Sequence, residues 1–202
     1  MTEPTHKKPH HHGNLRQTLI DAGIALLEEG SAESLTLRKC AARAGVSHAA
    51  PAHHFDGLLG LKAAIAEQGF DIFSRYMLEA AESGPQTPRA RLKGICTGYL
   101  RFGLDHPALF RLIFSFDAKI LAEKELDPGN AQSYMILRDC CAPFVPKDAD
   151  PVVIETQVWA LIHGYTSLVL DGRFYDPRTK TLGQGPFDAV MTLLDHIGQP
   201  AP

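Results

Sequence analysis

Hydrophobic positions recur at helical spacing from the first structured stretch of the chain. That stretch begins after Asn14, a residue that favours the start of a helix, and Gly30 provides its end. Its apolar positions lie three or four residues apart, as on one helix face: Leu15, Leu19, Ala22 and Leu26. Because alternating, strand-like runs and internal repeats are absent from the whole sequence, the pattern predicts an all-α fold of about nine helices.

Two short helices are predicted next, joined by a turn at Gly45. Thr36 is a candidate N-cap for the first, whose apolar positions are Leu37, Cys40, Ala41 and Ala44. Ser47 is a candidate cap for the second, which extends to about His54. Two short helices around a glycine turn are typical of a helix-turn-helix, whose second helix enters the major groove of DNA.

The remaining helices are predicted from apolar periodicity and from the glycines and prolines that interrupt it. They cover residues 58–81, 88–104, 107–116, 118–126, 130–142, 152–171 and 187–197, with a long loop at 171–186. These elements suggest a flexible tail (1–13), a helix-turn-helix DNA-binding domain (14–60) and a second, helical domain (61–202).

Composition fits a packed protein. The 202 residues are 45% hydrophobic and 21% charged with a net charge of −3, which argues against a polycation that coats nucleic acid. Residues 1–62 nevertheless carry seven Lys or Arg against six acids, and seven of the ten histidines. Lacking an apolar leader or a span of about 18 apolar residues, the chain is expected in the cytoplasm, with no membrane partner.

Three segments in the first third of the chain carry a family resemblance. Residues 35–38 (Leu-Thr-Leu-Arg), 41–47 (Ala-Ala-Arg-Ala-Gly-Val-Ser) and the pair His54-Phe55 resemble the N-terminal domain of the tetracycline-repressor (TetR) family of transcriptional regulators. The pattern Trp159, His163, Gly164 and the run from His106 to Phe110 are similar to the C-terminal domain of the Trp-His-Gly branch of that family.

The resemblance implies a homodimer that binds a near-palindromic double-stranded DNA operator, represses transcription and is released by a small-molecule effector. At the positions where the family touches DNA stand Thr36, Arg38, Ser47, His48, Ala49, His53 and His54. The chain departs from the family at Ala52, where a tyrosine is usual, and at Leu58, where a lysine is usual. His53, His54 and Lys62 are candidates to replace those phosphate contacts.

Pro51 lies early in the predicted reading helix. It removes one backbone donor and biases the preceding residue away from α geometry, so we expect a tight or distorted helix there. His48 and Ala49 would then face the bases, and His53 and His54 the phosphates. The alternative is that His54 packs on the helices and His53 alone is exposed. Histidines that gain charge beside phosphate would make DNA affinity rise as pH falls.

An effector pocket in the second domain should be apolar with a few polar groups. The candidates are Phe70, Phe73, Tyr99, Phe102, Phe110, Phe114, Trp159 and His163, with ordinary core packing as the alternative for each. The last two long helices are predicted to form the dimer contact, which a palindromic operator requires. Its candidates are Val158, Leu168, Leu193, Leu194 and Ile197.

Three other functions remain as alternatives. An enzyme is disfavoured because no catalytic triad, carboxylate pair or phosphate loop stands out, and no cofactor or metal is predicted. A metal-responsive regulator would use His6 and the tract 10–12, although a solvated tail or a tag remnant is the favoured explanation of these histidines. A thiol-responsive regulator would use Cys140 and Cys141, although adjacent cysteines rarely form disulfides.

Overall fold

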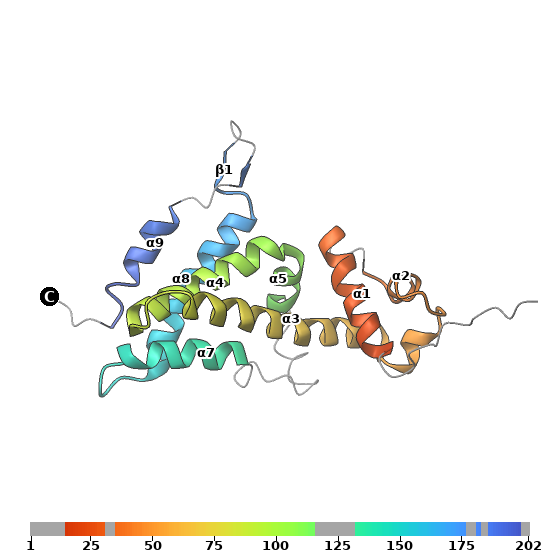
Figure 1. Ribbon diagram of the computed structural model, residues 1–202, viewed down its shortest axis with the longest axis horizontal. Coiled ribbons are helices and arrows are strands. Elements are labelled where there is room, and N and C mark those ends of the chain that lie inside the picture. The colour runs from red at the N-terminus through yellow and green to blue at the C-terminus, as the bar shows by residue number, and fades with distance from the viewer. Residues whose placement is uncertain (1–14, 31–34, 116–131, 177–180, 183–185, 199–202) are drawn as a thin grey trace, which may run out of the picture. The chain divides into compact units, whose positions relative to one another are not determined.

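The computed structural model describes residues 15–30, 35–115, 132–176, 181–182 and 186–198, which form eight α-helices, two 3-10 helices and one two-stranded hairpin (Figure 1). The all-α prediction is confirmed. Asn14, the tail 1–13 and the predicted helix 118–126 lie outside the described residues. Within the described residues, every helix is too short or too polar to cross a bilayer.

The chain divides into two compact units, residues 1–65 and 66–202. The first contains α1 (Leu15–Glu29), α2 (Leu37–Arg43), the 3-10 helix η2 (Ala50–His53) and the start of α3 (Gly57–Glu82). One face of each helix contributes to its core. Gly23 of α1 lets the Ile65 side chain of α3 pack against the α1 backbone, since a Cβ at Gly23 would lie 2.5 Å from Cδ1 of Ile65. The fully buried side chains include Leu19, Leu27, Leu35, Cys40, Leu61 and Ile65.

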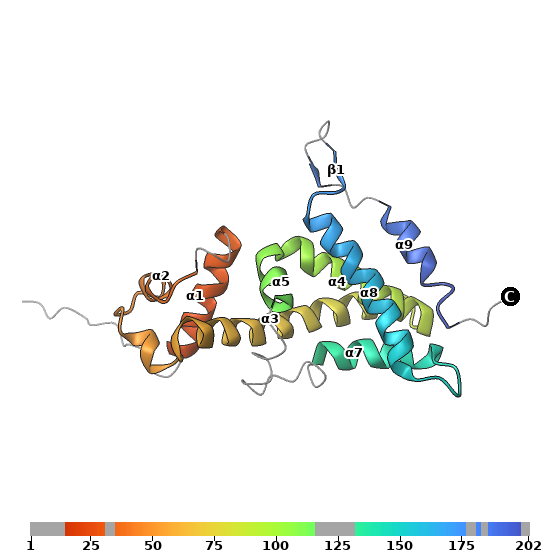
Figure 2. The ribbon, with the colours of Figure 1, turned by 180° about the vertical axis from the view of Figure 1, so that it is seen from behind.

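The second unit contains the rest of α3, α4 (Pro88–Asp105), α5 (Pro107–Phe114), α7 (Gln132–Cys141), the 3-10 helix η3 (Ala142–Phe144), α8 (Pro151–Leu170) and α9 (Phe187–Leu193). Helix α4 packs against α5, α7 and α8, as Figure 1 and the reverse view in Figure 2 both show. Its central position requires a glycine at Gly98, because a Cβ there would lie 2.2 Å from the carbonyl oxygen of Tyr76 on α3.

Helix starts in this unit follow the prolines of the sequence. Pro88, Pro107 and Pro151 each open a helix, where a missing backbone N–H costs nothing. The Thr87 hydroxyl accepts from the backbone N–H of Ala90 at 3.3 Å, and the Asp150 carboxylate accepts from that of Val152 at 3.0 Å. Within the predicted loop 171–186, β1 (Tyr175–Asp176) pairs antiparallel with β2 (Thr181–Leu182).

The segment after α9 is held by Arg89 of α4. The guanidinium donates to the carbonyl oxygens of Leu194 and Ile197 and lies 3.8 Å over the ring of Phe144. Gly198 adopts a φ of +74°, and a Cβ there would also meet Phe144. The C-terminal segment is therefore fixed on the α4 and η3 surface through its backbone.

Candidate functional site

Helix α2 is fixed by a cap at its start and by an ion pair at its end. The Thr36 hydroxyl accepts from the backbone N–H of Lys39 at 3.2 Å, which is the predicted N-cap. At the other end, Arg43 donates to both carboxylate oxygens of Glu29, at 2.5 and 2.6 Å, and this pairing lowers the pKa of Glu29. Arg38, the second residue of α2, is exposed to solvent.

The third helix of this unit is a 3-10 helix of four residues, Ala50–His53, so it is shorter than predicted. Ser47 does not begin it: the residue before the helix is Ala49, which provides no side-chain cap, and Ser47 gives only its carbonyl to the N–H of Ala50 at 3.0 Å. Pro51 at the start of the helix is buried, which agrees with the expected tight geometry. His48 and Ala49 consequently lie in an exposed turn before it.

Both histidines at the end of this segment are exposed. His53 and His54 face solvent, so the alternative in which His54 packs among the helices is not the observed arrangement. Phe55 provides the anchor instead: it is 7% exposed, and the Arg16 guanidinium lies 5.6 Å over its ring. Lys62, one turn into α3, is half-buried.

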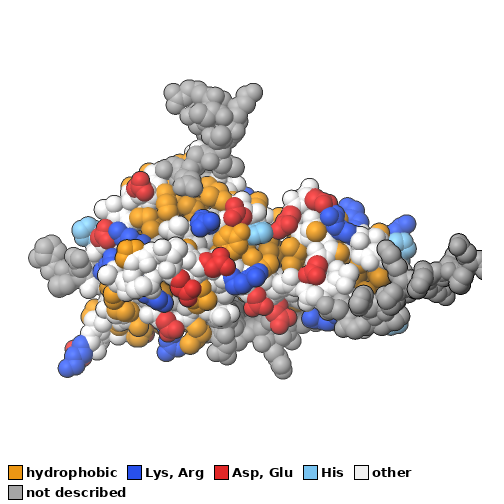
Figure 3. Space-filling model, viewed as in Figure 1, with side chains coloured by type: hydrophobic (Ala, Val, Ile, Leu, Met, Phe, Trp, Pro, Cys, Tyr) orange, Lys and Arg blue, Asp and Glu red, His pale blue; other side chains and the backbone are white. Residues whose placement is uncertain are grey.

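The surface formed by these groups is basic and histidine-bearing but not uniformly so. Thr36, Arg38, Ser47, His48, Ala49, His53 and His54 are all exposed. Figure 3 shows Lys, Arg and His side chains on the N-terminal unit, interspersed with acidic ones. Such a surface has hydroxyls, a guanidinium and imidazoles available for phosphates and base edges.

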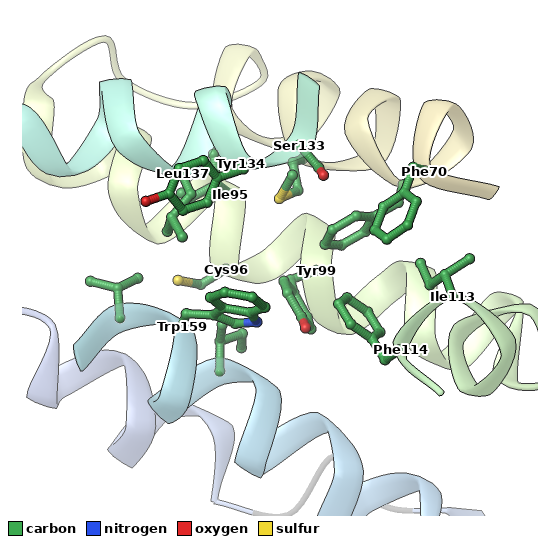
Figure 4. A pocket seen from close by; sticks show the side chains of 14 residues that line it. Phe70, Ile95, Cys96, Tyr99, Ile113, Phe114, Ser133, Tyr134, Leu137 and Trp159 are labelled. Carbon is green, nitrogen blue, oxygen red and sulfur yellow. The ribbon is translucent and has the colours of Figure 1, made fainter. Parts of the chain in front are cut away.

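A cavity of about 280 Å³ lies within the C-terminal unit, between α3, α4, α5, α7 and α8 (Figure 4). Five of the eight residues predicted for an effector pocket line this cavity: Phe70, Phe73, Tyr99, Phe114 and Trp159. Sequence reasoning missed the other lining residues, which are mostly aliphatic: Met77, Ile95, Cys96, Ile113, Ser133, Tyr134, Leu137, Val158 and Ile162. Helical spacing from Trp159 and from Phe73 would have indicated Ile162 and Met77.

The other three predicted residues do not line the cavity. Phe102 is fully buried, and Phe110 is 3% exposed and stacks on the His163 ring at 5.6 Å between centroids. His163 is half-buried, and its ring contacts two residues that do line the cavity: Nδ1 lies 2.7 Å from the Tyr99 hydroxyl, and the ring meets Phe114 edge-on at 4.9 Å between centroids. These three side chains support the cavity wall.

A hydrogen bond joins the cavity wall to the helix behind it. The Tyr99 hydroxyl lies 2.7 Å from Nδ1 of His163, and the Trp159 indole nitrogen lies on the same side of the cavity as that hydroxyl (Figure 4). Burial raises the pKa of Tyr99 and lowers the pKa of His163. Tyr99 is therefore a protonated phenol and His163 a neutral imidazole, and the tautomer of His163 decides which of the two donates.

A second polar contact lies at the α7 side. The Tyr134 hydroxyl donates to Oε2 of Glu155 at 2.5 Å, and Glu155 is only 3% exposed. That hydrogen bond raises the pKa of Tyr134, because the protonated phenol is the form that donates.

The cysteines show no sign of a redox or metal site. All four are free and buried, and burial raises the pKa of Cys40, Cys96 and Cys140 and raises that of Cys141 to about 12. Thiols of raised pKa react slowly because little thiolate forms. Among the described residues no group of His, Cys, Asp and Glu is arranged to hold a metal, and the histidines of residues 6–12 lie outside them.

The residues predicted for a dimer contact divide between core and surface. Leu168 on α8 and Leu193 on α9 are 47% and 54% exposed. Val158 on α8 and Leu194 at the end of α9 are instead core residues, 0% and 1% exposed. Ile197 is half-buried and also gives its carbonyl to Arg89.

The two units together define a class of protein: a small helical unit with a helix-turn-helix arrangement, and a helical unit with an apolar pocket that opens to solvent. Residues 92–194, just over half of the chain, match the family model described as tetracyclin repressor-like, C-terminal domain. The chain belongs to this TetR-like family. The match does not distinguish the Trp-His-Gly branch, which stays a prediction.

Solved structures show the same fold. A Rhodococcus sp. RHA1 protein of unknown function is 26% identical, with a TM-score of 0.73, over 96% of this chain and 100% of that one. A TetR family transcription regulator from Marinobacter aquaeolei VT8 is 17% identical, with a TM-score of 0.60, over 92% and 93% of the two chains. The TetR family repressor AlkX from Dietzia sp. is 19% identical, with a TM-score of 0.53, over 91% and 97%. No curated protein matches the sequence.

Proposed function

We propose that this protein is a transcriptional repressor that binds a near-palindromic DNA operator as a homodimer and is released by a small molecule. The observation that carries the proposal is the exposure of His48, Ala49 and His53, which follow a capped, basic helix α2 in a TetR-like chain. A short reading element after a helix that crosses the backbone is the arrangement that helix-turn-helix proteins use. The protein would act in the cytoplasm.

Helix α3 supports coupling between effector and operator. It begins at Gly57, four residues after His53, and its residues Phe70, Phe73 and Met77 line the cavity of the other unit. An effector that repacks these side chains would act on a helix whose first turns belong to the DNA-binding unit. We therefore propose that the cavity is the effector site and that α3 transmits its occupancy.

A homodimer is supported by the apolar side chains that α8 and α9 leave uncovered. Leu168 and Leu193 are about half exposed in the single chain, and a two-fold interface would cover them. Trp159, His163 and Gly164 on the same helix α8 support placement in the Trp-His-Gly branch.

The test is fluorescence anisotropy with DNA from upstream of the protein's own gene, measured against random DNA at two salt concentrations. Arg38→Ala should weaken specific binding at least about fivefold, the effect of one lost base or phosphate contact. Arg75→Ala is the matched control, because Arg75 is also exposed but lies in the second unit.

The histidines are tested in the same assay. His48→Ala with His53→Ala should weaken binding to the specific DNA, whereas His196→Ala, at an exposed C-terminal position, should leave it unchanged. Equal affinity for specific and random DNA that neither substitution changes would contradict the operator-binding proposal. If the upstream DNA gives this result, the assay is repeated with DNA sequences selected from a random pool, and equal affinity there decides against operator binding.

A further inference from the structure

The cavity wall of the C-terminal unit has a polarity that restricts what it can bind. No described residue that lines it carries a charge. Its polar members are the Tyr99, Tyr134 and Ser133 hydroxyls, the Cys96 thiol and the Trp159 indole. An ionised ligand inside would need a charged or multiply donating partner to offset its desolvation.

The two phenol groups of that wall are already hydrogen-bonded within the protein. The Tyr99 hydroxyl lies 2.7 Å from Nδ1 of His163, and the Tyr134 O–H donates to Oε2 of Glu155. In Figure 4 the Trp159 nitrogen and the Tyr99 oxygen lie on the same side of the cavity. Both are neutral groups, so an uncharged polar group can hydrogen-bond there, whereas an anion would lose its hydration without gaining a charged partner.

The size and shape of the cavity restrict the ligand further. Its volume of about 280 Å³ is nearly twice the roughly 150 Å³ apolar cavity that holds a benzene ring, so it suits about twelve non-hydrogen atoms. Rings supply much of the wall: Phe73 meets Tyr99 edge-on at 4.8 Å between centroids, and Phe114 meets Phe73 at 5.8 Å. Ring edges and faces at these separations accommodate another ring among them.

We propose that the effector is a compact, uncharged, ring-containing molecule whose polar group lies beside Tyr99 and Trp159. Its role as an effector rests on the proposed function, whereas its binding does not. The ligand class follows from a wall of aromatic rings on which no described side chain carries a charge.

The test compares two probes of the same shape and different charge, 4-isopropylbenzamide and 4-isopropylbenzoate, each of about twelve non-hydrogen atoms, the number the cavity volume suggests. Trp159, the single tryptophan of the chain, lines the cavity and reports binding through its fluorescence, with calorimetry as a second readout. The amide should bind with a Kd below about 1 mM, and the carboxylate at least about 100-fold more weakly.

A matched pair of variants locates the site. Ser133→Leu adds bulk inside the cavity and should weaken amide binding at least about tenfold, by overpacking the space that the ligand needs. Met135→Leu is the control, because Met135 lies on the same helix α7, is 39% exposed and does not line the cavity. Circular dichroism and thermal melts establish that both variants are folded.

Three results would overturn the proposal: the carboxylate binds as tightly as the amide, neither probe binds below the stated limit, or folded Ser133→Leu binds the amide as the parent does. The regulatory role is judged separately by adding the amide to the DNA complex. Binding in the cavity without release from DNA would leave the ligand class standing and contradict effector release by that class.

Discussion

Helices α3 and α4 cross so closely at Gly98 that even an added methyl group should destabilise the protein. At Gly98 an added Cβ would lie 2.2 Å from the Tyr76 carbonyl oxygen and 2.7 Å from the Met77 Cα. Both are backbone atoms, so relief requires the two helices to separate by about 1 Å, into a core that contains Phe73 and Phe102.

The expected cost follows from two opposing terms. Overpacking of this kind costs about 1–3 kcal/mol, and the upper end applies where backbone must move. Replacing glycine by alanine inside a helix returns about 1 kcal/mol. We expect Gly98→Ala to lower the free energy of unfolding by about 2 kcal/mol, which is a Tm lower by about 4–8 °C for a chain of this length.

Gly164 provides the matched control, since it lies inside α8 of the same unit and nothing lies within 4 Å of its added Cβ. Gly164→Ala should raise the free energy of unfolding by about 0.5–1 kcal/mol. Urea unfolding followed by circular dichroism measures both variants. Gly98→Ala at or above parental stability with an unchanged m-value would refute the reasoning. A loss for Gly164→Ala that depends on protein concentration would place a partner subunit against α8.

Three further predictions concern the cap, a histidine and the thiols. Thr36→Ala should lower the free energy of unfolding by about 1 kcal/mol through loss of the α2 cap, and Thr36→Ser should restore it, both measured by urea unfolding. The pKa of His163 is lowered in the folded state, so the unfolded chain binds more protons as pH falls below about 6.5 and stability should decrease there. His163→Phe should flatten that dependence between about pH 6.5 and 5, and an unchanged slope would remove His163 as its source. Cys96 should react with a thiol reagent at least about 100-fold more slowly in the native than in the urea-unfolded protein, because burial raises its pKa and blocks access, and comparable rates by mass spectrometry would contradict this.

Helix positions were largely predictable because prolines and capping residues near each end in the sequence determine where a helix begins. Pro88, Pro107 and Pro151 open helices where proline is tolerated, and Thr36 caps α2 as its spacing indicated. Ser47 failed as a cap because the tight turn before Pro51 delays the helix to Ala50, an outcome of geometry that propensity does not encode.

The effector pocket and the dimer contact were less predictable, because periodicity identifies the apolar face of a helix but not whether that face packs on the core, lines a cavity or remains exposed. Val158 and Leu168 both belong to the apolar positions of α8, yet one lines the cavity and the other is half exposed. Choosing aromatic residues for the pocket found part of its wall. The aliphatic part comes from α4, α7 and α8, and only their three-dimensional packing brings Ile95, Leu137 and Ile162 together.

The attachment of the C-terminal segment by Arg89 has a consequence for how this surface can diverge among relatives. The guanidinium binds carbonyl oxygens of Leu194 and Ile197, which every amino acid possesses. Exposed side chains near this attachment, such as Leu193, can therefore be replaced without loosening it. If the proposed homodimer forms through this surface, a duplicated copy of the protein would acquire a new pairing preference while its fold stays the same.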